Sequence, residues 1–201
     1  MPNPSEAILE VFRETGALLE GHFLLSSGLH SPKYLQCALV LQDPSRAERL
    51  CGQLARAFTG ETIDCVVSPA LGGIVVAHEL ARALGTKAVF AEREDGRMTL
   101  RRGFQIEPGQ RVLLAEDVIT TGGSLREVLA MVKAAGAEVA GVAALVDRTG
   151  ARDPELGAPL TALVRLDVPI YPPEECPLCD KGLPLVKPGS RPRPAEKGSA
   201  E

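Results

Sequence analysis

Short apolar runs alternate with amphipathic helical stretches through the middle of the chain. The runs lie at residues 64–68, 87–91, 111–117 and 139–146, and the helical patterns at 43–58, 74–84 and 125–135. Strands that are apolar throughout are covered on both faces, and repeated strand–helix units give parallel strands. The sequence therefore predicts an α/β fold, with a mostly parallel sheet flanked by helices.

Turn and capping residues set the limits of the other parts of the chain. Asp43-Pro44 is typical of a helix start, with an acid at the N-cap and proline in the first turn. Residues 5–15 have a helical pattern, and residues 21–36 alternate turns with short extended pieces. We expect one domain with small additions in 201 residues, and a disordered tail from Lys187, where Pro, Gly, Ser and charge prevail.

Composition excludes several classes of protein. A formal net charge of −4, no Trp and few Tyr or Phe argue against a nucleic-acid-binding protein, which needs cations for phosphates and rings for bases. No apolar run approaches the ~20 residues that cross a bilayer, and no secretion signal opens the chain. Five cysteines, an odd number, do not suit a disulfide framework. We therefore expect a cytoplasmic protein.

The most informative segment, residues 112–124, has the sequence VLLAEDVITTGGS. A buried-type strand ends in two adjacent carboxylates, Glu116 and Asp117, and is followed by a turn of hydroxyls and glycines and then by a helix. In an open parallel sheet, ligands bind beyond the carboxyl ends of the strands. Backbone N–H groups of residues 120–124 can converge on a phosphate there, and glycine leaves room for its close approach.

The acid pair suits a sugar. Where the strand bends, Glu116 and Asp117 can both accept hydrogen bonds from neighbouring hydroxyls, each worth ~1.5–3 kcal/mol. An ordinary helix start with exposed acids is the plainer interpretation, but it does not explain four apolar residues before the acids and Thr-Thr-Gly-Gly-Ser after them. The segment is neither a dinucleotide fingerprint nor a Walker loop, because G-x-G-x-x-G and G-K-[ST] are absent.

Residues 112–124 resemble the phosphoribosyl-diphosphate motif of type I phosphoribosyltransferases. Within that superfamily the chain most resembles the orotate phosphoribosyltransferases, from Ile8 to Ala151. The further matches are HFLLSSGLHSPKYLQ (22–36), like the family's N-terminal hood, SPALGGIVVA (68–77), like its diphosphate loop, and LVDR (145–148), like the end of its base-site strand. The resemblance implies the type I phosphoribosyltransferase fold, with a hood at 1–42, an α/β core at 43–170 and a C-terminal extension at 171–201.

The resemblance implies a Mg²⁺-dependent transfer of ribose 5-phosphate from phosphoribosyl diphosphate to orotate, giving orotidine 5′-monophosphate and diphosphate in pyrimidine nucleotide synthesis. Positioning and electrostatic stabilisation of an oxocarbenium-like ribose should dominate catalysis, and substrate oxygens should hold most of the Mg²⁺ shell. By resemblance, the phosphoribosyl-diphosphate site comprises Arg93, Glu116, Asp117, Val118, Ile119, Thr120, Thr121, Gly122, Gly123 and Ser124. The diphosphate loop would comprise Ala70, Leu71, Gly72 and Gly73, and Asp117 would also be catalytic.

Two residues, Thr120 and Arg148, match family positions that contact orotate. Arg148 suits this substrate because a guanidinium can bind a carboxylate through two hydrogen bonds. The charged stretch 92–103 (EREDGRMTLRRG) occupies the place of the family's mobile catalytic loop, which closes over the diphosphate of the neighbouring subunit. The resemblance thus implies a homodimer, with a solvated charged hairpin as the alternative.

The sequence departs from the family pattern at three places. The loop has arginines where many members have lysines and a histidine, and Arg97 is the candidate for their catalytic role, which would be electrostatic because a guanidinium stays protonated. Gly72 stands where many members have a lysine, and Ser26 where many have a hood lysine. Lys33 is a candidate to replace the latter.

The remaining histidines and cysteines point to no clear chemistry. His22, His30 and His78 show no metal-binding spacing; His78 is expected to be structural, whereas His30 lies near the expected base site and its role stays open. Cys176 and Cys179 form a single CxxC without partner cysteines or a nearby histidine. A tight turn with free thiols is favoured there over zinc shared between protomers and over redox activity. The other cysteines should lie in the core: Cys37, Cys51 and Cys65.

Two other functions stay open. A phosphoribosyltransferase for a purine or another base would share the phosphate motif, but Arg148 favours orotate because a neutral base needs no cation. A phosphoribosyl-diphosphate-sensing regulator on the same fold would bind RNA or DNA. The net charge of −4 and the lack of an added DNA-binding segment count against the regulator, which a basic stripe on one face would support.

Overall fold

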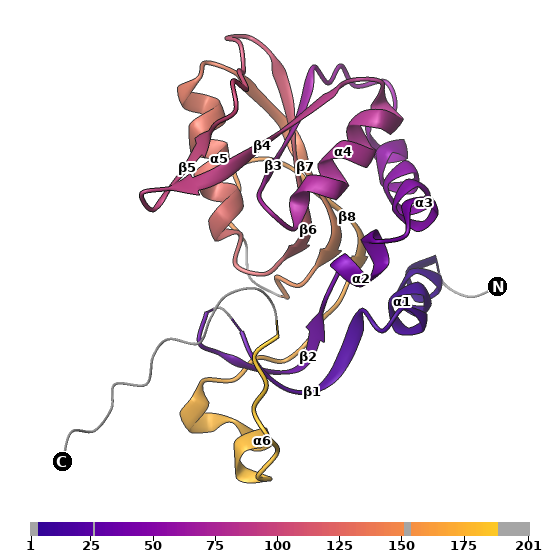
Figure 1. The fold of residues 1–201 in the computed structure, drawn as a ribbon, viewed down its shortest axis with the longest axis vertical. Helices are drawn as coiled ribbons and strands as arrows, with labels where there is room; N and C mark the ends of the chain where they lie inside the picture. The colour runs from indigo at the N-terminus through magenta and orange to yellow at the C-terminus, as the bar shows by residue number, and fades with distance from the viewer. Residues whose placement is uncertain (1–3, 26, 151–153, 189–201) are drawn as a thin grey trace.

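The computed structural model describes residues 4–25, 27–150 and 154–188 (Figure 1). The main sheet has the strand order β5-β4-β3-β6-β7-β8. Its strands are β3 (Cys65–Pro69), β4 (Lys87–Glu94), β5 (Arg97–Leu100), β6 (Arg111–Ile119), β7 (Glu138–Asp147) and β8 (Leu160–Arg165). Neighbouring strands are parallel except β4 and β5. The predicted α/β fold with a mostly parallel sheet is confirmed.

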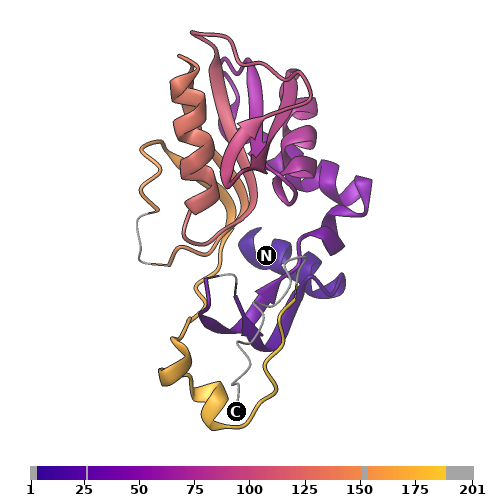
Figure 2. The same cartoon turned by 60° about the vertical axis from the view of Figure 1, so that its left-hand side comes forward.

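Helices cover both faces of this sheet, as Figure 2 shows, with α5 on one side and α3 and α4 on the other. The helices are α1 (Pro4–Glu14), α2 (Ala38–Leu41), α3 (Pro44–Ala55), α4 (Gly73–Leu84), α5 (Gly123–Ala134) and α6 (Pro177–Asp180), with 3₁₀ turns at Arg56–Phe58 and Pro173–Glu175. No helix in the described ranges is long and apolar enough to cross a membrane.

Strand β6 shows why its sequence is apolar throughout. Leu113 and Ala115 pack in the core beneath α3 and α4, whereas Val112 and Leu114 pack in the core beneath α5. Successive side chains of a strand point to opposite faces, so a central strand between two helical layers needs an apolar residue at every position. The three cysteines expected in the core are buried.

The predicted cap of α3 is confirmed. The Asp43 carboxylate accepts hydrogen bonds from the backbone N–H groups of Ser45 (2.9 Å) and Arg46 (3.3 Å). Pro44 occupies the first turn, where its missing N–H leaves nothing unpaired. This cap fixes the start of α3, which follows the short helix α2 that leads out of the hood.

The charged stretch after residue 91 is a ribbon rather than a loop. Strand β4 continues to Glu94 and turns back at Asp95-Gly96 into β5, and the two strands pair antiparallel. Figure 1 shows this hairpin projecting beyond the rest of the sheet. Helix α2 and strand β8 had no counterpart among the predicted elements, because a four-residue helix and a half-buried edge strand are too short for a clear period.

The hood is a two-stranded antiparallel hairpin of β1 (Leu18–Leu24) and β2 (His30–Leu35). The C-terminal extension lies against both of its edges. Tyr171 exchanges two backbone hydrogen bonds with His30 (2.8 and 2.9 Å), and Val186 bonds to His22 and Leu24 (2.9 and 2.8 Å). The residues from Lys187 were expected to be disordered. Lys187 and Pro188 directly follow Val186, which is bonded to β1, and residues 189–201 lie outside the described ranges.

Close packing at the start of α4 generates a stability prediction. A Cβ on Gly73 would lie 2.8 Å from Ser68 Cβ and 3.0 Å from the Ala115 carbonyl oxygen, both on buried strands. We expect Gly73→Ala to lower the free energy of unfolding by about 1–3 kcal/mol, because neither strand can move freely. Thermal unfolding measures this change.

The matched control is Gly52→Ala in α3, where an added Cβ meets nothing within 4 Å. That variant should be stabilised by about 0.5–1 kcal/mol, since alanine favours a helix interior. Equal midpoints for the two variants would show that Gly73 is not tightly packed.

Candidate active site

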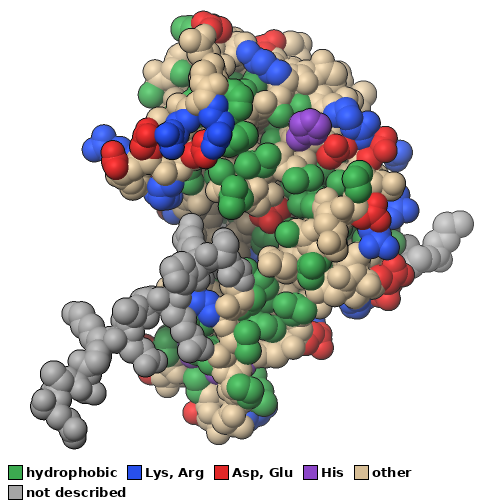
Figure 3. All heavy atoms as spheres, viewed as in Figure 1, with side chains coloured by type: hydrophobic (Ala, Val, Ile, Leu, Met, Phe, Trp, Pro, Cys, Tyr) green, Lys and Arg blue, Asp and Glu red, His purple; other side chains and the backbone are tan. Residues whose placement is uncertain are grey.

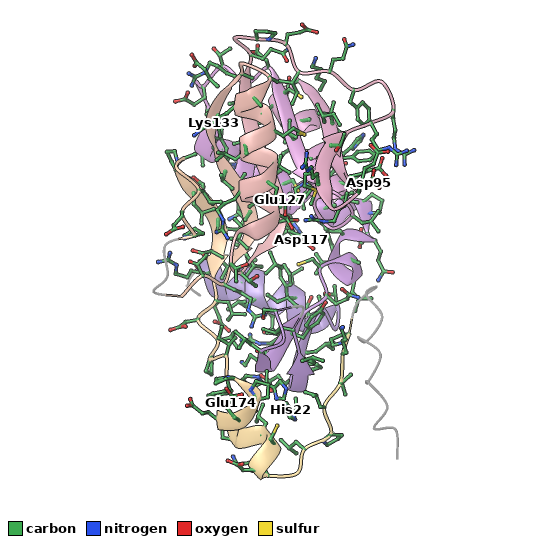
Figure 4. All side chains as sticks on the ribbon, turned by 90° about the vertical axis from the view of Figure 1, so that its left-hand side faces the viewer. His22, Asp95, Asp117, Glu127, Lys133 and Glu174 are labelled. Atoms are coloured by element: carbon green, nitrogen blue, oxygen red, sulfur yellow. The ribbon has the colours of Figure 1, made fainter. Side chains whose placement is uncertain are left out.

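A pocket of about 900 Å³ lies between the carboxyl ends of the central strands and the hood. The residues that line it include Leu25, Leu29, Tyr34, Gln36, Leu71, Gly72, Arg93, Glu127, Arg148, Ile170, Lys187 and all of residues 116–125. This is where an open parallel sheet binds its ligands. Figure 4 shows Asp117 and Glu127 near each other at this level of the molecule. The predicted motif, hood and base-site arginine therefore share one cavity.

The turn between β6 and α5 is built for an anion. Gly122 adopts φ +72° immediately before α5, a left-handed conformation that favours glycine. Arg126 donates to the carbonyl oxygens of Thr121 (2.7 Å) and Pro154 (2.8 Å), which holds the turn against the connection between β7 and β8. The exposed Thr120 and Thr121 and the N-terminus of the twelve-residue α5 face the pocket. Free N–H groups and the helix dipole there favour a phosphate.

Glu116 and Asp117 form a strained electrostatic pair on the pocket floor. Glu116 Oε1 accepts from the Asp117 backbone N–H (3.2 Å), and Asp117 Oδ1 accepts from the Val118 N–H (2.8 Å). Burial, followed by the negative charge of Asp117, raises the pKa of Glu116 well above its usual range, and burial also raises the pKa of Asp117. No Lys or Arg in the described ranges forms an ion pair with either group. The two side chains can therefore accept hydrogen bonds from hydroxyl groups of a ligand or bind a cation.

Gly72 lets the loop before α4 lie directly against Asp117. A Cβ at position 72 would sit 2.9 Å from both carboxylate oxygens of Asp117, closer than side chains tolerate. The Ala70–Leu71 peptide bond in this loop is cis, and Leu71 is 74% exposed at the pocket. The position at which many family members have a lysine thus has no room for a side chain in this arrangement.

Arg148 presents an uncompensated cation to the hood side of the pocket. Its backbone N–H bonds to the Ile119 carbonyl oxygen (2.8 Å), which places it beside the phosphate motif, and its guanidinium donates to Ser31 Oγ (3.2 Å). Its Nε is buried without a hydrogen-bond partner, and burial lowers the pKa of the group. A buried donor without a partner suits a ligand that brings an acceptor.

Arg93 and Glu127 form the wall opposite the hood. The guanidinium of Arg93 donates to both carboxylate oxygens of Glu127 (2.9 and 2.7 Å), and this partner raises the pKa of Arg93. The bidentate contact fixes the β4–β5 hairpin, close to its turn, to α5. Arg93 therefore lines the pocket as the resemblance implies, but with its charge already partly matched.

Three of the expected site residues do not line this pocket. Ala70 and Gly73 lie in the diphosphate loop and at the start of α4, behind Leu71 and Gly72. Arg97 lies on the exposed β5 strand of the projecting hairpin. Ser26 is outside the described ranges, and Lys33 is held by Glu20 at 3.0 Å.

Sequence reasoning missed several residues that line the pocket, and those with ionisable side chains are Tyr34, Glu127 and Lys187. Tyr34 could have been inferred from its place in the hood segment, which was expected to cover the base site. Burial raises the pKa of its phenol. Glu127 sits one helical turn after the phosphate motif, a position that could have been inferred from helical spacing. Lys187 comes from the extension, and nothing in the sequence places that segment over the pocket.

The CxxC pair was expected to have no histidine nearby, and the structure places two histidines next to it. His22 and His30 lie beside Cys176 and Cys179, with the ligand atoms of all four within 4.8 Å of one another. More than 140 residues separate the two pairs, so sequence spacing could not bring them together. His78, expected to be structural, has a side chain 72% exposed beside Glu79 on α4.

Comparisons with known proteins show the family to which the chain belongs. The family model described as phosphoribosyl transferase domain matches residues 40–161. Proteins named orotate phosphoribosyltransferase from Caldicellulosiruptor bescii and Pelotomaculum thermopropionicum are 56% and 57% identical to the chain over 186 and 187 residues, each covering 92% of this chain and 97% of the relative.

A solved structure shows the same architecture. The crystal structure of orotate phosphoribosyltransferase from Aeropyrum pernix matches with a TM-score of 0.66 at 28% identity, covering 79% of this chain and 93% of that chain. The matched family model spans the phosphate motif and the diphosphate loop, and the matches to the relatives cover 92% of the chain. The chain therefore belongs to the phosphoribosyltransferase family and, within it, to the orotate phosphoribosyltransferases.

Proposed function

We propose that the chain transfers the ribose 5-phosphate group of phosphoribosyl diphosphate to N1 of orotate, releasing diphosphate. The bond between the anomeric carbon and the diphosphate oxygen breaks, the bond from N1 forms, and the N1 proton is released. The single observation that carries the choice of base is Arg148, a half-buried cation whose Nε has no partner beside the phosphate motif. The carboxylate of orotate supplies the missing acceptor.

The roles of the other residues follow from their places in the pocket. The turn at residues 120–124 holds the 5-phosphate, and Glu116 and Asp117 accept hydrogen bonds from the ribose hydroxyls. The backbone at Leu71 and Gly72 holds the diphosphate close to Asp117. Two carboxylates beside the anomeric carbon favour the positive charge that develops on the ribose as diphosphate leaves.

The donor set fits Mg²⁺ bound together with substrate. The pocket floor offers oxygen atoms of two carboxylates whose pKa values burial has raised, which is a place for a hard cation but not a complete cage. Glu116 and Asp117 would hold the ion, directly or through water, and diphosphate oxygens would complete its shell. When bound, Mg²⁺ neutralises charge on the departing diphosphate.

A homodimer with shared hairpins accounts for the position of Arg97. This residue lies on the projecting β4–β5 hairpin, away from the lining of its own pocket. A hairpin that extends from one chain can cover the diphosphate of a second chain, where Arg97 would stabilise the departing charge.

The five free cysteines favour a location in the cytoplasm, where thiols are kept reduced.

The alternatives have less support. A purine base would leave the Arg148 guanidinium without its acceptor. A nucleic-acid-binding regulator needs a basic surface, whereas Lys and Arg are interspersed with Asp and Glu on the face seen in Figure 3.

The first test is the loss of orotate absorbance with phosphoribosyl diphosphate and Mg²⁺, with adenine, guanine and hypoxanthine assayed in parallel. Mg²⁺-dependent consumption of orotate alone is expected. Turnover of a purine would overturn the choice of base, and binding of phosphoribosyl diphosphate without turnover of any base would favour the regulator.

Asp117→Asn should separate catalysis from stability. We expect kcat/KM to fall by at least about 100-fold, because one acceptor for the ribose is lost. The folded state raises the pKa of Asp117, so this carboxyl costs stability increasingly as the pH rises from about 4 through its raised pKa. The melting temperature of the variant at neutral pH should therefore equal or exceed that of the unmodified chain.

Activity assays and thermal unfolding between pH 4 and 8 check both parts. Asp167→Asn, at an exposed position, is the matched control and should change neither property. Unchanged turnover of Asp117→Asn would remove this carboxylate from the site.

Arg148→Ala should weaken the binding of the base specifically. Loss of charge-assisted hydrogen bonds worth ~1.5–3 kcal/mol predicts a KM for orotate about 10–100-fold higher. The KM for phosphoribosyl diphosphate should change much less. Arg148→Lys keeps the charge but loses the forked geometry of the guanidinium. Its KM for orotate should therefore lie between that of the unmodified chain and that of Arg148→Ala. Equal effects on both substrates would contradict a carboxylate-binding role.

Mixing two inactive variants tests the shared hairpin. If Arg97 acts on the partner chain, a dimer of Arg97→Ala with Asp117→Asn has one intact site. After random exchange of subunits, about half of the dimers are mixed, and each mixed dimer has one intact site out of two. The mixture should therefore show about a quarter of the activity of the unmodified chain. No recovery in dimers shown by mass to have exchanged would place Arg97 in its own chain's site, and full activity of Arg97→Ala alone would remove Arg97 from catalysis.

A further inference from the structure

A second cluster of reactive side chains lies at the end of the hood remote from Asp117. Figure 4 shows His22 there, beside the extension that carries Glu174. The ligand atoms of His22, His30, Cys176 and Cys179 lie within 4.8 Å of one another. His22, His30 and Cys176 are 3%, 4% and 1% exposed. This cluster has no part in the proposed transfer reaction.

The hairpin register places the two histidines together. Leu24 pairs with His30 across β1 and β2, and His22 is two residues before Leu24 on the same face. His22 and His30 are therefore diagonal neighbours, within reach of each other's side chains. Their Nε2 and Nδ1 atoms are 2.9 Å apart.

The extension delivers the two sulfurs to the same point. Cys176 and Cys179 flank one tight turn, in which the Cys176 carbonyl oxygen accepts from the Cys179 N–H (3.0 Å). Cys176 Sγ lies 3.6 Å from His22 Nε2, and Cys179 Sγ lies 3.7 Å from the same nitrogen and 3.3 Å from His30 Nδ1. Backbone bonds at Tyr171 and Val186 fix both ends of this segment to the hairpin.

The contact with Leu183 fixes the tautomer of His22 and aims its free lone pair at the cluster. His22 Nδ1 is 2.9 Å from the Leu183 carbonyl oxygen, which can only accept, so this nitrogen carries the proton. His22 Nε2 is then a bare acceptor when the ring is neutral, and it faces one nitrogen and two sulfurs. His30 Nδ1 can donate to this nitrogen as an N–H. When the proton of His30 is on Nε2 instead, Nδ1 aims a second lone pair at the same point, where a cation can bind both nitrogens.

We propose that His22, His30, Cys176 and Cys179 bind a structural zinc ion. Tetrahedral zinc with Zn–N of ~2.0–2.1 Å and Zn–S of ~2.3 Å places nitrogen and sulfur about 3.5 Å apart and two nitrogens about 3.3 Å apart. The three nitrogen–sulfur distances of 3.3–3.7 Å fit this geometry. The two nitrogens, 2.9 Å apart, need to separate by a few tenths of an ångström.

The chemistry of the set selects zinc. Two thiolates and two imidazoles in a tetrahedral arrangement are typical of structural zinc, and binding releases the two thiol protons. The bond from His22 Nδ1–H to Leu183 is the kind of outer contact that orients a ligating histidine. Four protein ligands leave no open position for a substrate.

The ion would hold the extension over the pocket. Ile170 precedes the zinc-binding segment and Lys187 follows it, and both line the pocket. A zinc ion at the far end of the hairpin would therefore restrict the movement of the segments that place Ile170 and Lys187 at the pocket.

Metal content of the full chain, purified without a polyhistidine tag, is the direct test. We expect about one zinc per chain by elemental analysis, since the cluster forms one four-ligand site. After removal of zinc with a chelator, Co²⁺ should give the visible bands and the thiolate charge-transfer band of a tetrahedral site. The double variant Cys176→Ser/Cys179→Ser should lose the metal and both spectra.

Matched controls are Cys51→Ala, which removes a buried thiol elsewhere, and His78→Ala, which removes an exposed imidazole. Both should keep the metal. The unmodified chain also gives a test that needs no variant, because chelation should lower its melting temperature and added zinc should restore it.

A natural-sequence chain that binds neither zinc nor Co²⁺, or a double variant that keeps one metal per chain, would overturn the proposal. So would a Cys176–Cys179 disulfide in protein purified with reductant. Orotate turnover by a stably folded chain that takes up no zinc would contradict the zinc site alone. A zinc-loaded chain without turnover would contradict the proposed function alone.

Discussion

The close approach of the loop at Leu71-Gly72 to the end of β6 determines the shape of the active site. Gly72 and Gly73 remove two side chains that would otherwise meet Asp117, Ser68 and the Ala115 backbone. Helix α4 can therefore begin directly beside the carboxylates, and the diphosphate loop and the ribose site share one wall. A side chain at Gly73 would press on Ser68 and on the Ala115 backbone of two buried strands, whereas one at Gly72 would displace the carboxylate end of Asp117.

The pocket keeps charges of both signs without matching them to each other. Two carboxylates lie on its floor with pKa values raised by burial, and a guanidinium on the hood side has a buried nitrogen without a partner. Each of these groups lowers the stability of the empty protein. A ligand with hydroxyls at one end and a carboxylate at the other satisfies both, so the arrangement is complementary to the substrate pair rather than to the protein itself.

The parts of the structure that local pattern controls could be predicted from the sequence. The apolar run of β6, the Asp43-Pro44 cap and the glycine-rich turn before α5 each depend on neighbours within a few residues. The motif also placed Glu116, Asp117 and residues 120–124 in one pocket, and Arg148 joined them because β7 runs parallel to β6. The β4–β5 hairpin was less certain, because its charged residues suit a loop and an exposed ribbon equally well.

What could not be predicted depends on contacts between distant segments. The imidazoles of His22 and His30 meet the sulfurs of Cys176 and Cys179 only because the extension returns to the hood. The position of Lys187 at the pocket has the same cause. Neither set has a periodic or spaced pattern, since the two partners are separated by most of the chain.

The return of the extension to the hood also affects the order in which the protein can be completed. A two-stranded hairpin is marginally stable alone, and both edges of this one are covered by residues near the end of the chain, at Tyr171 and Val186. During synthesis the two strands of the hairpin leave the ribosome well before residues 171–186, so their edges stay open until those residues follow. The hairpin is therefore completed only after all strands of the main sheet have been synthesised.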